Sequence, residues 1–147
     1  MLPKYFRLIV LNDTDQTLTY NNDARIEVTY VGWKFTSGVM EYASEAKQNA
    51  VFLTTGETLA ADGQSIGTDI TNASTLYLGL HGTFSVTADV TSTDGTMYLY
   101  MEESTDNSVW PSAAADFDIT KHCTLIAALA LSTDAVDEDA QVNFELN

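Results

Sequence analysis

The chain has 147 residues, 45% of them hydrophobic, and a formal net charge of −15 at pH 7. This length fits one domain and the apolar fraction is too high for a disordered protein, so we expect a single domain over residues 1–147. The negative field disfavours nucleic acid and anionic membranes as partners, and the single cysteine, Cys123, excludes an internal disulfide.

The charge is unevenly distributed. Residues 1–47 carry five bases and six acids, whereas residues 48–147 carry one base and fifteen acids. This asymmetry suggests a near-neutral part that contacts a partner and an acidic part that faces water, although general solubility explains it equally well. The opening residues lack the pattern of a secretion signal, and no segment approaches the ~20 apolar residues of a membrane helix.

The first third of the chain predicts strands separated by turns. Tyr5–Leu11 is apolar on both faces apart from Arg7, which predicts a central strand covered on both sides. A turn cluster at Asn12–Gln16 and a short strand at Thr17–Tyr20 follow, and then a turn at Asn21-Asn22-Asp23.

An alternating strand is predicted over Ala24–Val31, where Ala24, Ile26, Val28 and Tyr30 share one face. Gly32 is interpreted as a bulge. A hairpin is predicted from Trp33 to Ala43 around Ser37-Gly38.

The middle of the chain is less regular. Ser44–Leu53 fits a short capped helix or an irregular crossover. Thr54–Ser74 predicts a long loop, a candidate for function, with one short strand near Ile66–Ile70. A buried strand is expected over Thr75–Leu80.

A second hairpin is predicted over Thr83–Glu103, with Asp94-Gly95 as its turn. Alternation sorts its side chains into two sets. One face carries Phe84, Val86, Ala88 and Val90 on the first strand and Met97, Leu99 and Met101 on the second; Tyr98, Tyr100 and Glu102 lie on the opposite face of the second strand.

The remaining segments also suggest strands. Ser104–Ser108 predicts a turn, Trp110-Pro111 the start of an extended stretch, and Phe117–Ile119 a short edge strand. Thr124–Leu131 fits a helix or a strand and has strand length, which favours a strand. Gln141–Leu146 alternates, which predicts a strand with Val142, Phe144 and Leu146 inward. Seven to nine short strands between turns predict an all-β, antiparallel β-sandwich or jelly roll with at most one short helix.

Few residues could support catalysis. The soft nucleophiles and metal ligands are His81, His122 and Cys123, and a catalytic dyad would need His81 to meet Cys123. The sequence has no familiar nucleophile or phosphate-binding motif. We therefore expect core or surface roles for these residues, no enzyme activity and no cofactor.

Three acidic clusters could ligate calcium, although solvated loops are the default interpretation. They are Asp134 with Asp137, Glu138 and Asp139; Glu102 with Glu103 and Asp106; and Asp116 with Asp118.

Four aromatic residues stand out: Trp33, Tyr98, Tyr100 and Trp110. They could cover the edge of the core, anchor a protein interface or stack on sugar rings.

Gly95–Ser112 (GTMYLYMEESTDNSVWPS) resembles a pattern in small structural proteins of tailed bacteriophages, in which a strand ending like Tyr-Leu-Glu-x-Ser-Thr-Asp leads into a turn and then Trp-Pro-Ser. The matching residues run from Leu99 to Asp106 and from Trp110 to Ser112, with Tyr-Leu present as Tyr98-Leu99. Asn107-Ser108 stands where such sequences usually have two glycines. The opening YFRLIVLNDTDQTLT and the closing VNFEL resemble the same group.

This resemblance implies a virion structural component with no catalytic residues. We expect a capsid decoration (cement) protein, made in the host cytoplasm, that binds the outside of the head shell. Its expected partners are the major capsid protein or other virion subunits and further copies of itself. Met1–Leu11 and Thr54–Ser74 are the predicted contacts. The alternatives are a tail, collar or head-fibre component, or a carbohydrate-binding module.

Overall fold

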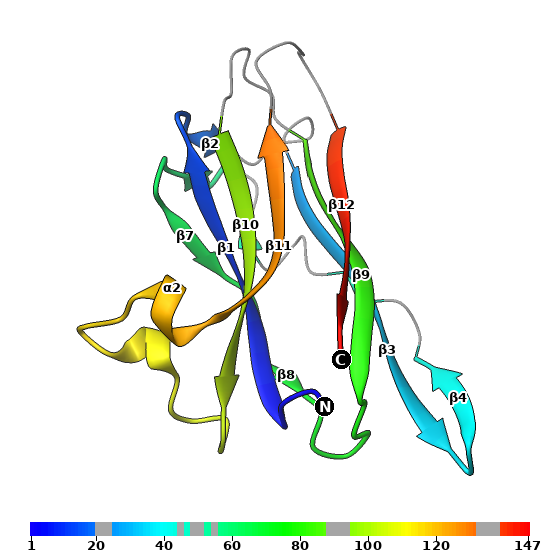
Figure 1. Cartoon of the computed structure of the whole chain (residues 1–147). Helices are drawn as coiled ribbons and strands as arrows, with labels where there is room; N and C mark the ends of the chain where they lie inside the picture. Colours follow the sequence, from blue (N-terminus) through cyan, green and yellow to red (C-terminus); the bar gives the residue numbers. More distant parts are fainter. Residues whose placement is uncertain (20–24, 44–45, 48–51, 54–55, 88–94, 132–138) are drawn as a thin grey trace.

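The structure is a computed structural model that describes residues 1–19, 25–43, 46–47, 52–53, 56–87, 95–131 and 139–147. Two antiparallel five-stranded sheets face each other, and their inner side chains form a shared core (Figure 1). The predicted all-β sandwich is confirmed. Two short helical elements are also present, a 3₁₀ turn, η1 (Pro111–Ala113), and a one-turn helix, α2 (Ile119–His122).

The first sheet has the order β11-β10-β1-β7, and β8 pairs with the other end of β1. Its strands are β1 (Tyr5–Thr14), β7 (Gln64–Ile66), β8 (Ile70–Thr71), β10 (Gly95–Ser104) and β11 (Thr124–Leu131).

The second sheet has the order β12-β9-β3-β4, and β5 also pairs with β3. Its strands are β3 (Arg25–Thr36), β4 (Val39–Tyr42), β5 (Ala46–Lys47), β9 (Gly79–Thr87) and β12 (Asp139–Leu146). A small separate ladder joins β2 (Leu18–Thr19) to β6 (Thr58–Leu59).

The predicted central strand is confirmed in β1. Leu8 and Val10 face the core between the sheets, and Ile9 packs on the opposite face against Tyr100 and Ile119. All three β1 residues are fully buried. The segment after β10 therefore covers the outer face of this sheet, as the position of α2 in Figure 1 shows.

The predicted hairpin over Thr83–Glu103 is wrong. β9 pairs with β3 and β12, whereas β10 pairs with β1 and β11, so the two strands belong to different sheets. Alternation marks the buried face of a strand but not the neighbour to which it bonds. Here the two buried faces meet across the core, and the inward directions of Phe84, Val86 and Leu99 are confirmed. Ala88, Val90 and Asp94 lie outside the described residues.

Gly32 is not a bulge. The pairing of β3 with β9 runs without a shift from Arg25 to Trp33. A Cβ at Gly32 would lie 2.8 Å from Cδ2 of Tyr77, so the glycine accommodates an aromatic ring rather than a change of register. The predicted turn at Asn12–Gln16 begins too early, because β1 continues to Thr14.

Three other expectations differ from the structure. Ala46–Lys47 forms a strand in place of the expected short helix or irregular crossover, and the segment Thr54–Ser74, expected to be a loop with one short strand, contains three. β9 begins only at Gly79, so Thr75–Leu78 is not strand. β5 pairs with β3, and β7 and β8 pair with β1, so long-range pairing gives these three segments their strand conformation despite weak local propensities.

After Trp110, the extended stretch ends at once in η1, and Ile119 begins α2 instead of completing an edge strand. Asp118 caps α2 by accepting a hydrogen bond from the Thr120 N–H, and this cap favours a helical turn. The strand interpretation of Thr124–Leu131 and the inward direction of Phe144 are confirmed. Asn21-Asn22-Asp23, Ser44-Glu45 and residues 48–51 lie outside the described ranges.

Candidate functional site: the outer face of the β3–β4 hairpin

The structure does not bring together the candidate nucleophiles and metal ligands, which are His81, His122 and Cys123. His81 lies exposed on β9, where its ring is 5.5 Å from that of Tyr42. Cys123 packs with Ile9 and Tyr100 on the outer face of the other sheet. Burial raises the pKa of the Cys123 thiol to about 12, with a further contribution from the charge of Glu102, so the thiol is protonated at neutral pH. His122 ends α2 and stacks on Phe117.

The acidic clusters have structural partners. Glu102 is fully buried and bonded to Arg7, and Asp118 caps α2 and pairs with Lys121. No group of three or more His, Cys, Asp or Glu side chains that could hold a metal ion occurs among the described residues. Asp134, Asp137 and Glu138, and the side chain of Asp139, lie outside them.

The Trp-Pro-Ser part of the motif anchors a loop. Trp110 is 8% exposed, and the Arg7 guanidinium lies 4.2 Å from its ring centroid. Arg7 also donates to Glu102 through Nε at 2.6 Å and to the Ser112 hydroxyl through Nη2 at 2.5 Å. Glu102 Oε1 in turn accepts the Ser112 backbone N–H. Glu102, Trp110 and Ser112 therefore hold the chain after β10 against the sheet.

The Ser-Thr-Asp part of the motif forms the predicted turn. Asp106 Oδ1 accepts the backbone N–H groups of Ser108 at 2.9 Å and Val109 at 3.1 Å, and the Ser104 hydroxyl donates to the Val109 carbonyl. These hydrogen bonds, that of the Ser108 N–H first, lower the pKa of Asp106 to about 2. The residues of the resemblance thus have local structural roles.

A different surface stands out on the second sheet. The hairpin of β3 and β4 is confirmed, with Thr36 opposite Val39 and a two-residue turn at Ser37 and Gly38, both at positive φ (52° and 83°). Trp33 lies opposite Tyr42, and Phe35 opposite Met40. Because directly opposed residues share a face, these four side chains form one continuous face, here called the apolar hairpin face.

The apolar hairpin face is exposed. Phe35 is 54%, Met40 44% and Tyr42 57% accessible, while Trp33 is half-buried. Trp33 lies across Gly79, where a Cβ would be 2.7 Å from its ring, and it contacts Phe35 edge-to-face at 6.1 Å. The Trp33 ring therefore packs on the sheet at Gly79, and the outer side of the apolar hairpin face is open to solvent.

The polarity of the outer face changes along β3. Nearer its start, Thr29 lies in register with Thr83, which pairs with Asn143, and Thr83 donates a hydrogen bond to Asn143 at 2.9 Å. Four residues after Thr29, the same outer face carries Trp33, and two residues after that it carries Phe35. Figure 1 shows β3 and β4 extending beyond the rest of the sandwich at this end.

The opposite face of the hairpin is mainly polar, although it also carries the exposed Val39 opposite Thr36. Lys34 lies opposite Glu41, the Thr36 hydroxyl donates to Glu41 at 2.7 Å, and the Lys34 ammonium lies 5.9 Å from the Tyr77 ring centroid. Residues 33–43 carry one base and one acid, so this hairpin has no net charge on a chain of −15. An exposed apolar face backed by a polar one is typical of a protein-binding surface.

The predicted contact segments are less suitable. In Met1–Leu11, the β1 residues Leu8, Ile9 and Val10 are fully buried and cannot reach a partner. In Thr54–Ser74, Ile66 is 40% exposed on the edge strand β7. Among the expected aromatic anchors, Tyr100 and Trp110 are buried, and Trp33 alone belongs to an extended apolar surface.

No protein-family model, curated protein or solved structure matches this chain. Across the described ranges, no helix is long and apolar enough to cross a membrane.

Proposed function

We propose that this chain is a structural protein of a tailed-bacteriophage virion, a capsid decoration (cement) protein that attaches to the head shell through the apolar hairpin face. The observation that carries the attachment site is the change from polar to apolar residues on the outer face of β3. Exposed apolar surface of this kind is costly in water, and a partner protein relieves that cost by covering it. The resemblance of Gly95–Ser112 supports the virion context.

Charge supports the proposed orientation. The hairpin is neutral, whereas the second part of the chain carries most of the excess acid. Contact through the hairpin brings little unpaired charge to the interface, and desolvating such charge is costly. The acidic remainder then faces water.

The chemistry of the face favours a protein over a sugar. Phe35 and Met40 provide no hydrogen-bonding groups, and Lys34, Thr36 and Glu41 lie on the other face of the hairpin. A sugar site needs polar groups beside its aromatic platform to bind hydroxyls. Trp110, another of the four candidate platforms, lies under Arg7.

The test is co-sedimentation of the purified protein with head shells assembled without it. Wild-type protein should bind stoichiometrically, and Phe35→Asp should weaken binding by at least about tenfold because a charge then has to be desolvated. Leu125→Asp is the matched control, since Leu125 is 51% exposed on β11 and should bind like wild type. Equal losses for the two variants would remove the hairpin from the interface.

Other outcomes identify the alternatives. Binding of a labelled copy to tails, collars or fibres but not to heads would replace the decoration role with one of those. A glycan-array signal that is lost in Trp33→Ala would indicate a carbohydrate-binding module.

A further inference from the structure

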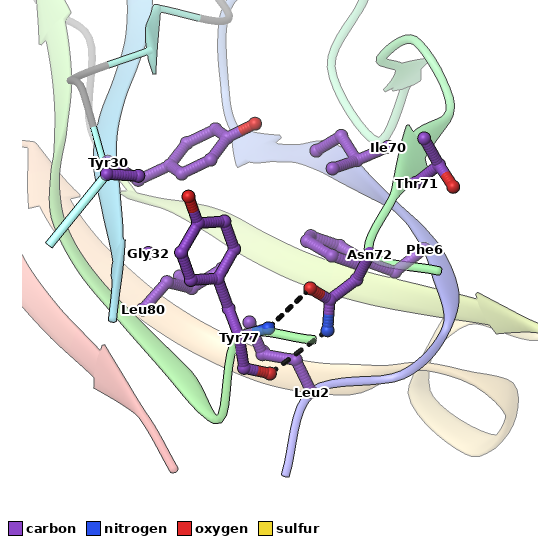
Figure 2. A pocket seen from close by; sticks show the side chains of 10 residues that line it. Leu2, Phe6, Tyr30, Gly32, Ile70, Thr71, Asn72, Tyr77 and Leu80 are labelled. Atoms are coloured by element: carbon purple, nitrogen blue, oxygen red, sulfur yellow. Dashed lines mark hydrogen bonds between the residues drawn. The ribbon is translucent and has the colours of Figure 1, made fainter. Parts of the chain in front are cut away.

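A cavity of about 170 Å³ lies between the two sheets, near the beginning of the chain. Figure 2 shows Tyr30 and Tyr77 on one side and Phe6 and Ile70 on the other. Leu2 closes it from below, and the Leu2 N–H is held by the Leu78 carbonyl at 3.1 Å. The cavity is thus bounded by both sheets and by the N-terminal segment.

The cavity is mostly apolar, although Tyr30 and Tyr77 bring their hydroxyl groups to its lining. The amide of Asn72 belongs to the lining, but its polar atoms face the backbone of Tyr77, with Oδ1 accepting the N–H at 2.7 Å and Nδ2 donating to the carbonyl at 3.0 Å. Figure 2 shows both bonds. No charged side chain is found among the described lining residues. The half-buried Ala43 and the exposed Thr71 mark the side open to solvent, whereas the Tyr77 ring occupies the space above Gly32.

Size and chemistry together define a ligand class. An apolar protein cavity of about 150 Å³ lined by Leu, Ile and Phe stays dry and binds benzene. The volume here is similar, and Leu2, Phe6, Ile70 and Leu80 supply the same kind of side chain, so we propose that this cavity binds one neutral, single-ring aromatic molecule of the size of benzene or toluene. Charged rings are excluded by the cost of desolvation. This inference does not depend on the proposed virion role.

The probes are benzene and toluene, with benzoate as the control. Binding is measured by NMR chemical-shift changes of the Leu2, Ile70 and Leu80 methyl groups. The first two probes should give saturable shifts, with a dissociation constant on the order of 1 mM, which is reasonable for so few atoms. Benzoate should give none. Absence of a saturable response to benzene or toluene overturns the proposal.

Substitutions that fill the cavity test whether benzene binds there. Ala43→Leu narrows the open side and Ile70→Phe fills the cavity from the other sheet, and each should abolish the response to benzene. Ala130→Leu adds the same atoms at an exposed position on β11 and should bind benzene like wild type. Benzene binding unchanged in both folded filling variants would overturn the assignment to this cavity.

Discussion

Arg7 on β1 and Glu102 on β10 lie directly opposite each other, and Arg7 Nε donates to Glu102 Oε2 at 2.6 Å across 95 residues of sequence. The Glu102 side chain is fully buried and that of Arg7 is 16% exposed. In the sequence, Arg7 is the charged residue of an otherwise apolar strand, and Glu102 belongs to an acidic cluster that could ligate calcium. The pair instead holds the Trp110–Ser112 segment onto the sheet.

Glu102→Ala should lower the free energy of unfolding by about 3 kcal/mol, because it leaves the largely buried Arg7 guanidinium without its main partner. Urea unfolding measures this loss. Glu103→Ala, at the exposed neighbouring position, should change stability by less than about 0.5 kcal/mol. In a double-mutant cycle, Arg7→Ala combined with Glu102→Ala should cost less than the two single changes together. Strict additivity would contradict the coupling.

Gly38→Ala should loosen the β3–β4 hairpin, because Gly38 has a φ of 83° and an L-residue in the left-handed region costs about 1 kcal/mol or more. Ser37→Asn should have the opposite effect by a few tenths of a kcal/mol, since Asn-Gly is the favoured pair for this turn. Hydrogen exchange of the β4 amides measures both changes. Equal exchange rates in the two variants would show that the turn does not control the hairpin.

Cys123 should react slowly with iodoacetamide at pH 8. With a pKa raised to about 12 by burial, its thiolate fraction is about two to three orders of magnitude below that of an ordinary cysteine. The same protein unfolded in urea is the control and should react at the normal rate. Because the unfolded thiol ionises first, the stability that burial of the neutral thiol provides falls as pH rises above about 9. Cys123→Ser should lack this fall.

Asp106→Asn should lower the melting temperature at pH 6, because the Asp106 carboxylate accepts the N–H groups of the turn. The folded pKa of about 2 lies below the ordinary value of 3.8, so the carboxylate stabilises the fold above about pH 4 and this contribution disappears as pH falls toward 2. The difference in melting temperature from wild type should therefore shrink between pH 4 and pH 2. A difference independent of pH would refute this role. Asp116→Asn, at an exposed position, is the control.

The apolar hairpin face shows why part of the site was not recognised in the sequence. The alternation of Ile26 and Val28 already indicated which residues of β3 point inward. The bulge predicted at Gly32 would have shifted the register and turned Trp33 and Phe35 to the other face, because one extra residue reverses every side chain that follows. The regular pairing of β3 with β9 keeps both aromatic residues outward.

The sequence by itself determined that the chain is built from β-strands and which side of most strands is buried, because a period of two is a local property of an extended backbone. Only the tertiary structure decided that β9 and β10 lie in opposite sheets, that Arg7 meets Glu102, and that the hairpin extends beyond the sandwich. These relations depend on which strands pair across long stretches of chain, and on closely packed neighbours such as Tyr77 over Gly32. Alternation within a single strand carries no information about either.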